Sequence, residues 1–222
     1  MTILDLHHEQ LAQVFLSGDE EKALNYTYRL LENHPRAYVF ENLITPAMYH
    51  VGKLWENNEI SVADEHLATA ICDFVLSKIE SDHEVPKRRQ QQSYKVLLFG
   101  VEEEQHYIGL KMVADTFKEH GWRVRYLGPD LPMEHSMLQI RKFQPDVIGI
   151  SAALSYRIPA IKKSIEAFTQ LEWKPTIMIG GRLAYKFDLS EFESDQVMVI
   201  KNIGHLTHWF KEGREESINE TS

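Results

Sequence analysis

The chain has 222 residues, of which 43% are hydrophobic and 26% charged, as is usual for a globular protein with one large or two small domains. Its formal net charge of −9 argues against a nucleic-acid surface, because phosphate binding requires a basic patch. No apolar run is long enough to span a bilayer, no signal peptide opens the sequence, and the single cysteine, Cys72, cannot form an internal disulfide. We therefore expect a soluble, cytoplasmic protein that binds neither nucleic acid nor membrane.

Residues 1–82 carry apolar side chains at helical spacing throughout and are predicted to form a helical domain. The first helix has a clear apolar face. The second is expected to bury a face formed by Leu24, Tyr28 and Leu31, and Pro35 ends this segment.

Two more helices complete this domain. Residues 36–54 predict the third, with a kink at Pro46, because proline cannot donate a backbone hydrogen bond inside a helix. The fourth is expected to begin at Ser61, where Ser61 and Asp64 resemble a capping box with Asp in place of the usual Glu. Four helices with short connections predict a four-helix bundle over residues 1–82.

A polar segment, residues 83–94, separates this bundle from a second domain over residues 95–215 and is predicted to be a linker. In the second domain, buried strand patterns alternate with helical ones. The expected strands are KVLLFG (95–100), RVRYLG (123–128), DVIGIS (146–151), TIMIGG (176–181) and QVMVI (196–200). This alternation predicts a flavodoxin-like (Rossmann-like) five-stranded parallel sheet, an α/β fold whose ligands bind beyond the carboxyl ends of the strands.

A histidine follows the first of these strands in the sequence Glu104-Gln105-His106, which places it at the ligand-binding edge. The turn lacks the G-x-G-x-x-G pattern of a dinucleotide site, and its carboxylates would repel phosphate. An imidazole can bind a metal through one nitrogen while a carboxylate accepts a hydrogen bond from the other, so Glu104 is a candidate to orient His106. A single histidine suits a metal that a macrocycle already holds.

Three further motif positions follow this histidine at defined spacing. The sequence has Glu104-x-His106-x-x-Gly109, then 41 residues before Ser151, and then Gly180-Gly181 after a further 26 residues that follow Ala153. This pattern resembles the D/E-x-H-x-x-G, S-x-L and G-G motif of the cobalamin-binding domain family. One departure is clear, because Ala153 stands in place of the motif's leucine.

The resemblance implies a role for each motif residue. His106 would displace the dimethylbenzimidazole base of cobalamin and become the lower axial ligand of cobalt, and Glu104 would orient it. Gly109 would let the first helix of the domain pass close to the corrin. Ser151 and Gly180-Gly181 would line the slot for the displaced nucleotide tail.

The helical domain adds a second resemblance. Trp55, Val62, Glu65 and His66 form the pattern W-x6-V-x2-E-H, which resembles the cap over the upper face of the cofactor in the adenosylcobalamin-dependent photoreceptor regulators. Trp55 and Val62 would shape the pocket, and Glu65 and His66 would contact the adenosyl group. These regulators usually carry a DNA-binding domain before the cap; we expect no such domain here, because the helical bundle begins near residue 1 and the chain is acidic. Glu56 stands where some of them carry a histidine that binds cobalt after illumination, so the resemblance does not extend to a bis-histidine photoproduct.

Together these patterns predict a non-catalytic cobalamin sensor, with adenosylcobalamin as cofactor and light as signal. Its output would pass through a regulatory protein partner or a homo-oligomer. The alternative hypothesis is a methyl-carrying corrinoid protein of a methyltransferase system, which would use methylcobalamin. A haem sensor on the same fold is a third possibility, because His106 could also bind iron.

Overall fold

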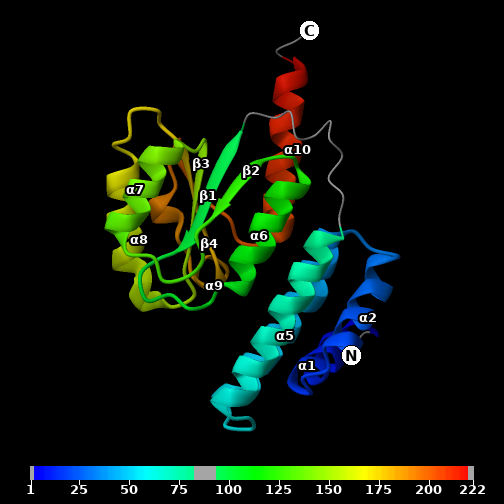
Figure 1. The fold of residues 1–222 in the computed structure, drawn as a ribbon. Helices are drawn as coiled ribbons and strands as arrows, with labels where there is room; N and C mark the ends of the chain where they lie inside the picture. The colour runs from blue at the N-terminus through cyan, green and yellow to red at the C-terminus, as the bar shows by residue number, and fades with distance from the viewer. Residues whose placement is uncertain (1–2, 83–93, 220–222) are drawn as a thin grey trace. The chain divides into compact units, whose positions relative to one another are not determined.

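The computed structural model describes residues 3–82 and 94–219 and divides the chain into two compact units, Met1–Glu84 and Val85–Ser222 (Figure 1). All of the segment expected to be a linker except Tyr94 lies outside the described residues. Within the described ranges, no helix combines the length and the apolar content needed to cross a membrane.

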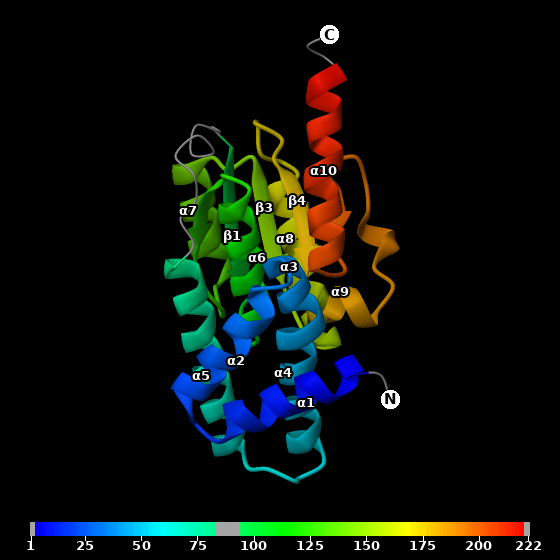
Figure 2. The same cartoon turned by 90° about the vertical axis from the view of Figure 1, so that its right-hand side faces the viewer.

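The first unit is helical, as predicted, and Figure 2 labels its helices. In chain order they are α1 (Ile3–Leu16), α2 (Glu20–Leu31), α3 (Arg36–Val39), the π-helical turn η1 (Phe40–Ile44), α4 (Thr45–Glu56) and α5 (Val62–Ser81). Because α3, η1 and α4 follow one another without a break, residues 3–82 form the expected four-helix bundle. Helix α1 packs against α4 and α5, and α2 packs against α1 and α5.

The buried face of α2 differs from the prediction. Ala23 and Thr27 are fully buried, whereas Leu24, Tyr28 and Leu31 are only partly so. Small side chains let neighbouring helices approach closely, and the Thr27 hydroxyl can be buried because it donates to the Ala23 carbonyl at 2.9 Å. The apolar spacing therefore located the helix correctly, and the three residues of its apolar face are half-buried, less deeply than Ala23 and Thr27.

Two local features near α4 and α5 bear on the sequence predictions. Before Pro46 lies the π-helical turn η1, in which the Thr45 N–H donates to the Phe40 carbonyl five residues back, and the kink expected at Pro46 stays a prediction. At the start of α5 the capping box is confirmed. The Ser61 hydroxyl accepts from the Asp64 N–H at 3.3 Å, and Asp64 accepts from the Ser61 N–H at 2.8 Å.

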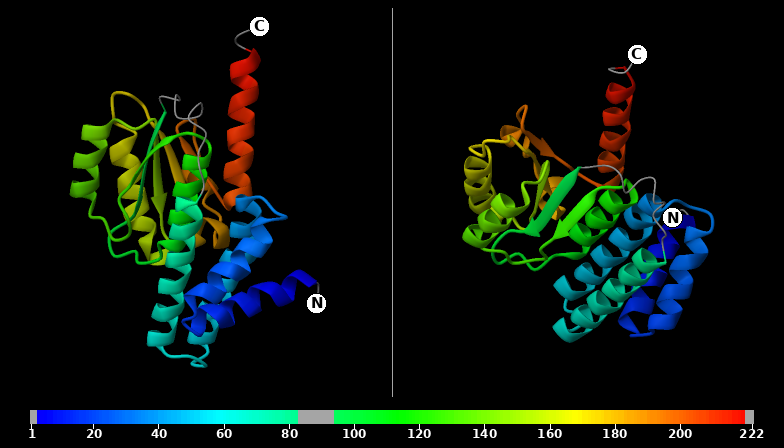
Figure 3. Two further views of the ribbon diagram at one scale, coloured as in Figure 1. Left: turned by 45° about the vertical axis from the view of Figure 1, so that its right-hand side comes forward. Right: turned by 45° about the horizontal axis from the view of Figure 1, so that its top comes forward.

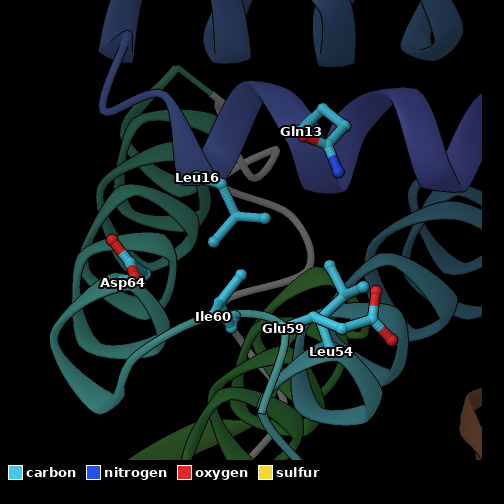
Figure 4. A pocket seen from close by; sticks show the side chains of 6 residues that line it. All are labelled: Gln13, Leu16, Leu54, Glu59, Ile60 and Asp64. Carbon is cyan, nitrogen blue, oxygen red and sulfur yellow. The ribbon is translucent and has the colours of Figure 1, made fainter. Parts of the chain in front are cut away.

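A hollow of about 410 Å³ opens at one end of the helical unit (Figure 4). Apolar side chains of α1, α4 and the α4–α5 turn border it together with polar ones: Gln13, Leu16, Leu54, Glu59, Ile60 and Asp64. The turn between α4 and α5 is therefore not packed against other side chains on all sides.

The second unit contains a five-stranded parallel sheet, which confirms the flavodoxin-like prediction. Its strands lie in the order β2-β1-β3-β4-β5, and their bounds are β1 (Lys95–Gly100), β2 (Arg123–Tyr126), β3 (Val147–Ser151), β4 (Thr176–Gly180) and β5 (Val197–Val199). The helices are α6 (Ile108–Glu119), α7 (Met133–Phe143), α8 (Ile158–Phe168), α9 (Arg182–Lys186) and α10 (Ile203–Asn219).

These helices cover both faces of the sheet (Figures 1 and 3). Side chains of α7, α8 and α9 pack with Leu97 and Phe99 on one face. Side chains of α6 and α10 pack with Val96 and Leu98 on the other. Successive residues of β1 point to opposite faces, and both faces are buried, so the strand reads as a continuous apolar run.

Candidate functional site

The strand register places the motif residues at one edge of the sheet. Gly100, at the end of β1, pairs with Ser151 at the end of β3, and Ser151 pairs with Gly180 at the end of β4. Because parallel strands all point the same way, the loops that follow these three positions begin side by side. The β1–α6 loop, which carries the candidate histidine, starts directly after Gly100.

Glu104 is the buried centre of this edge. Only 1% of the residue is exposed, and its carboxylate accepts three hydrogen bonds. One oxygen, Oε1, accepts from the His106 backbone N–H at 2.8 Å and from the His106 ring Nδ1 at 2.6 Å. The other, Oε2, accepts from the Ala153 N–H at 2.6 Å. A buried carboxylate is tolerated when it is hydrogen-bonded in this way.

The protonation of this pair follows from its contacts. Burial raises the pKa of Glu104, but the hydrogen bonds from the His106 ring, the His106 N–H and the Ala153 N–H outweigh burial and hold that pKa below its ordinary value. An ionised carboxylate can only accept, so Nδ1 of His106 carries a proton, and in the neutral ring the lone pair is then on Nε2. With 55% of the His106 side chain exposed, the ring can present Nε2 to a ligand.

Ala153, the departure from the motif, contributes through its backbone. Its N–H binds Glu104 Oε2, and this links the loop after β3 to the loop after β1. The side chain at this position takes no part in that bond. Replacing the motif's leucine with alanine therefore leaves the link intact.

The glycines of the motif differ in whether the fold itself excludes a side chain. At Gly181, φ is +91°, and an added Cβ would lie 2.4 Å from the Ala152 carbonyl oxygen and 2.8 Å from Ser151 Oγ, so the fold itself excludes a side chain. At Gly180 a Cβ would come no closer than 3.7 Å, to the Ile200 carbonyl, and at Gly109 it would meet nothing within 4 Å. The chain leaves free space beside these two glycines.

The four residues of the cap pattern all lie around the α4–α5 junction of the helical unit. Trp55 is 49% exposed and Val62 is 54% exposed, although both are large apolar residues. Glu65 accepts a hydrogen bond from the Thr69 hydroxyl at 3.0 Å, and His66 Nε2 lies 3.7 Å from Glu65 Oε2. Exposed apolar and polar side chains thus share the start of α5 within this unit.

Two further residues of the sheet edge were missed by the sequence analysis. Asp130, in the loop after β2, accepts from the Glu103 N–H at 2.6 Å and from Gln105 Nε2 at 3.2 Å. Arg157, after β3, donates to the Glu103 carbonyl at 2.7 Å and pairs with the Glu103 carboxylate. The convergence of parallel strands applies equally to the end of β2, so the place of Asp130 after this strand is the signal that could have indicated it.

Both units match families of known proteins. Residues 94–200 match a family described as B12 binding domain, and residues 8–80 match a second family with the same description. Dimethylamine corrinoid protein 1 of Methanosarcina mazei is 22% identical over 176 residues, which cover 78% of this chain and 81% of that protein. The HTH-type transcriptional repressor CarH of Myxococcus xanthus is 27% identical over 75% of this chain, but the match spans about half of the repressor, 54%.

A solved structure shows the same fold. The monomethylamine corrinoid protein of Methanosarcina barkeri superposes with a TM-score of 0.73 at 15% identity, and the match covers 93% of this chain and 98% of that chain. Both the helical bundle and the parallel sheet therefore belong to a known architecture.

Proposed function

The chain belongs to the family of B12-binding proteins, and from this premise we propose that it is a corrinoid protein that carries a methyl group for a partner methyltransferase and does not itself catalyse the transfer. The observation that carries the proposal is the extent of similarity to a dimethylamine corrinoid protein, 81% of whose length is matched. A match of 176 residues is longer than either unit of this chain, so it includes parts of both.

The residues at the sheet edge fit a cobalamin. His106 would bind cobalt through Nε2, because Nδ1 is committed to Glu104. Gly109 and Gly180 leave space that the fold does not need, and Ser151 and Gly181 border it, so these four would line the room for the corrin and the nucleotide tail. Bound cobalamin supplies a cobalt–carbon bond that can hold a methyl group or, in its adenosyl form, one that light breaks.

The first experiment tests the cobalt ligand. The protein is incubated with methylcobalamin in the dark and gel-filtered, and the absorption spectrum of the eluted protein is recorded. We expect retained corrin whose spectrum shows histidine in place of the dimethylbenzimidazole base, and we expect His106→Ala to abolish that spectrum. His135→Ala removes an exposed histidine of the same unit and is the matched control. Retention with the same spectrum in His106→Ala would overturn the proposed ligand.

The second experiment tests the carrier function. Protein loaded with methylcobalamin is mixed with a thiol and a corrinoid-dependent thiol methyltransferase, and the methylated thiol is measured. We expect transfer that depends on the methyltransferase and that is faster than from an equal concentration of free methylcobalamin. If the bound methyl group reacts no faster than the free cofactor, the chain is not a carrier.

The second candidate function is light sensing with adenosylcobalamin. The cap pattern favours it, because Trp55, Val62 and His66, which are exposed, and Glu65, which is half-buried, resemble the cap of the photoreceptor regulators. Protein loaded with adenosylcobalamin in the dark would then change its spectrum and its elution volume under green light, and His66→Ala would weaken the response. The sequence alone placed this function first, but the longer match to the corrinoid protein leads us to place it second.

A further inference from the structure

The residue directly before Glu104 has an unusual backbone conformation. Glu103 has φ of +62°, in the left-handed region that residues with a side chain rarely adopt and glycine adopts freely. Any relaxation of Glu103 would move Glu104, and with it the acceptor that holds the His106 ring. The position of the candidate cobalt ligand therefore depends on what keeps Glu103 in this conformation.

Two side chains from other strand ends hold Glu103. Asp130, after β2, accepts its backbone N–H at 2.6 Å, and Arg157, after β3, donates to its carbonyl at 2.7 Å and pairs with its carboxylate. Both polar groups of the Glu103 peptide backbone are thus engaged by charged side chains. Only 14% of the Arg157 side chain is exposed, although 73% of the Glu103 side chain is.

The same aspartate also binds the two residues that follow Glu103. The Asp130 N–H donates to the Glu104 carbonyl at 3.0 Å, and Asp130 Oδ2 accepts from Gln105 Nε2 at 3.2 Å. The three residues before His106 are therefore all tied to Asp130. Strained conformations persist where the surrounding structure determines them in several ways, and this loop has that character.

We propose that Asp130 and Arg157 are positioning residues that keep Glu103 left-handed and thereby set the fraction of molecules in which His106 is in place to bind cobalt. This inference rests on the proposed role of His106 as the axial ligand. Neither side chain needs to contact the cofactor for this role. Their effect passes through Glu103 and Glu104 to the imidazole.

The first test uses the protein without cofactor. In Arg157→Ala and Asp130→Ala, the amide hydrogens of His106 and Ala153, which both donate to Glu104, should exchange on the order of tenfold faster than in the unmodified chain. Arg141→Ala removes an exposed arginine from α7 of the same unit and should leave these rates unchanged. Unchanged exchange in both variants would overturn the proposal, whether or not the chain binds cobalamin.

The second test measures the ligand directly. Protein produced with 15N-labelled histidine is loaded with cob(II)alamin. The 15N doublet in its electron paramagnetic resonance spectrum, distinct from the 14N triplet of the dimethylbenzimidazole base, reports the fraction of cobalt bound by imidazole, with His106→Ala as the zero reference. We expect the ratio of bound to unbound histidine to fall on the order of tenfold in either variant. Arg157→Lys keeps the charge but cannot engage the Glu103 carbonyl and carboxylate together, so its ratio of bound to unbound histidine should lie between those of the unmodified chain and Arg157→Ala.

The decisive comparison repeats Arg157→Ala in a chain that also carries Glu103→Gly. Glycine adopts the left-handed conformation unaided, so the loss of Arg157 should then change the ratio by less than about twofold. An equally large loss with and without Glu103→Gly would show that Arg157 acts by another route and would refute the proposal. If the unmodified chain retains no cobalamin, the proposed function fails, but the exchange test still decides whether Asp130 and Arg157 hold the loop.

Discussion

The two units place their candidate site residues in opposite environments. At the edge of the sheet, Glu104 is 1% exposed, and every oxygen of its carboxylate is bonded to a residue of the same unit. In the helical unit, Trp55 and Val62 are about half exposed, and the His66 side chain is 74% exposed. The sheet edge is therefore assembled by the fold, whereas the cap residues have few contacts within their own unit.

This difference separates two kinds of contribution to binding. A site whose groups are fixed beforehand spends little free energy on ordering when the ligand arrives, and its residues are also needed for stability. Exposed apolar residues contribute little to the stability of their own unit, and their effect appears only when something covers them. Substitutions at the sheet edge should therefore lower the free energy of unfolding even without ligand, whereas substitutions of the cap residues should leave it almost unchanged.

The largest effect is expected for Gly181→Ala at the sheet edge. The left-handed φ of +91° and the 2.4 Å approach of a Cβ to the Ala152 carbonyl should lower the free energy of unfolding by about 3 kcal/mol or more. Gly180→Ala, one residue earlier, meets only ordinary contacts and should change that free energy by less than about 1 kcal/mol. Urea unfolding of the full chain without cofactor measures both.

The same glycine pair distinguishes fold from ligand. If Gly180 is small because the ligand needs the space, Gly180→Ala should fold normally and yet retain much less cobalamin after gel filtration. Normal retention in a stable Gly180→Ala would show that the space beside this glycine is not used.

The next effect concerns the buried carboxylate. Glu104→Ala leaves the Ala153 N–H, the His106 N–H and the His106 ring without their acceptor. Ala153 is buried, and an unsatisfied buried donor costs about 1–3 kcal/mol. We expect a loss of about 2–3 kcal/mol in urea unfolding, even though cofactor is absent from the measurement. Glu102→Ala removes an exposed carboxylate of the same loop and should have little effect. Equal losses in the two variants would mean that Glu104 is not a structural centre of this edge.

Much of this edge could be predicted from the sequence because its signals are local. Buried parallel strands read as continuous apolar runs. One of the five strand predictions matches the observed bounds, and the other four differ from them by at most two residues at either end. The capping box at Ser61 needs only residues three apart. The motif spacing located Glu104, His106 and Ser151 without reference to the structure, and the strand register then placed them at one edge.

The remaining features depend on contacts between distant segments. The left-handed conformation of Glu103 is stabilised by Asp130 and Arg157, which are 27 and 54 residues away in sequence. No local pattern indicates that a glutamate adopts a conformation typical of glycine. The backbone N–H of Ala153 binds Glu104 whatever its side chain, so this contact leaves no mark in the sequence. In α2, the burial of Ala23 and Thr27 depends on how closely α1 and α5 approach.

A smaller effect is expected in the helical unit, where one substitution can be made at two valines. Val51 in α4 is fully buried, and Val51→Ala should lower the free energy of unfolding by about 2 kcal/mol, because two methyl groups lose their contacts and leave a cavity. Val62, at the start of α5, is 54% exposed, and Val62→Ala should change the free energy of unfolding by less than about 0.5 kcal/mol. Thermal unfolding compares the pair, and a large loss in Val62→Ala would contradict the view that the cap residues contribute little to their own unit.

The smallest expected effect is a pH dependence at the other end of α5. The Tyr28 hydroxyl donates to the Asp82 carboxylate. Burial and this bond raise the pKa of Tyr28 to about 12. The same bond and one from the Ser81 hydroxyl lower the pKa of Asp82. The stabilisation from Asp82 should be present above the ordinary carboxyl pKa of about 3.9 and be lost as pH falls through its lower folded value. The stabilisation from Tyr28 should be present below about pH 10 and be lost as pH rises through about 12.

Tyr28→Phe should therefore be slightly less stable than the unmodified chain in urea unfolding near neutral pH and equally stable at both extremes. A stability difference that stays constant across the whole range would show that the hydroxyl acts through packing and not through this hydrogen bond.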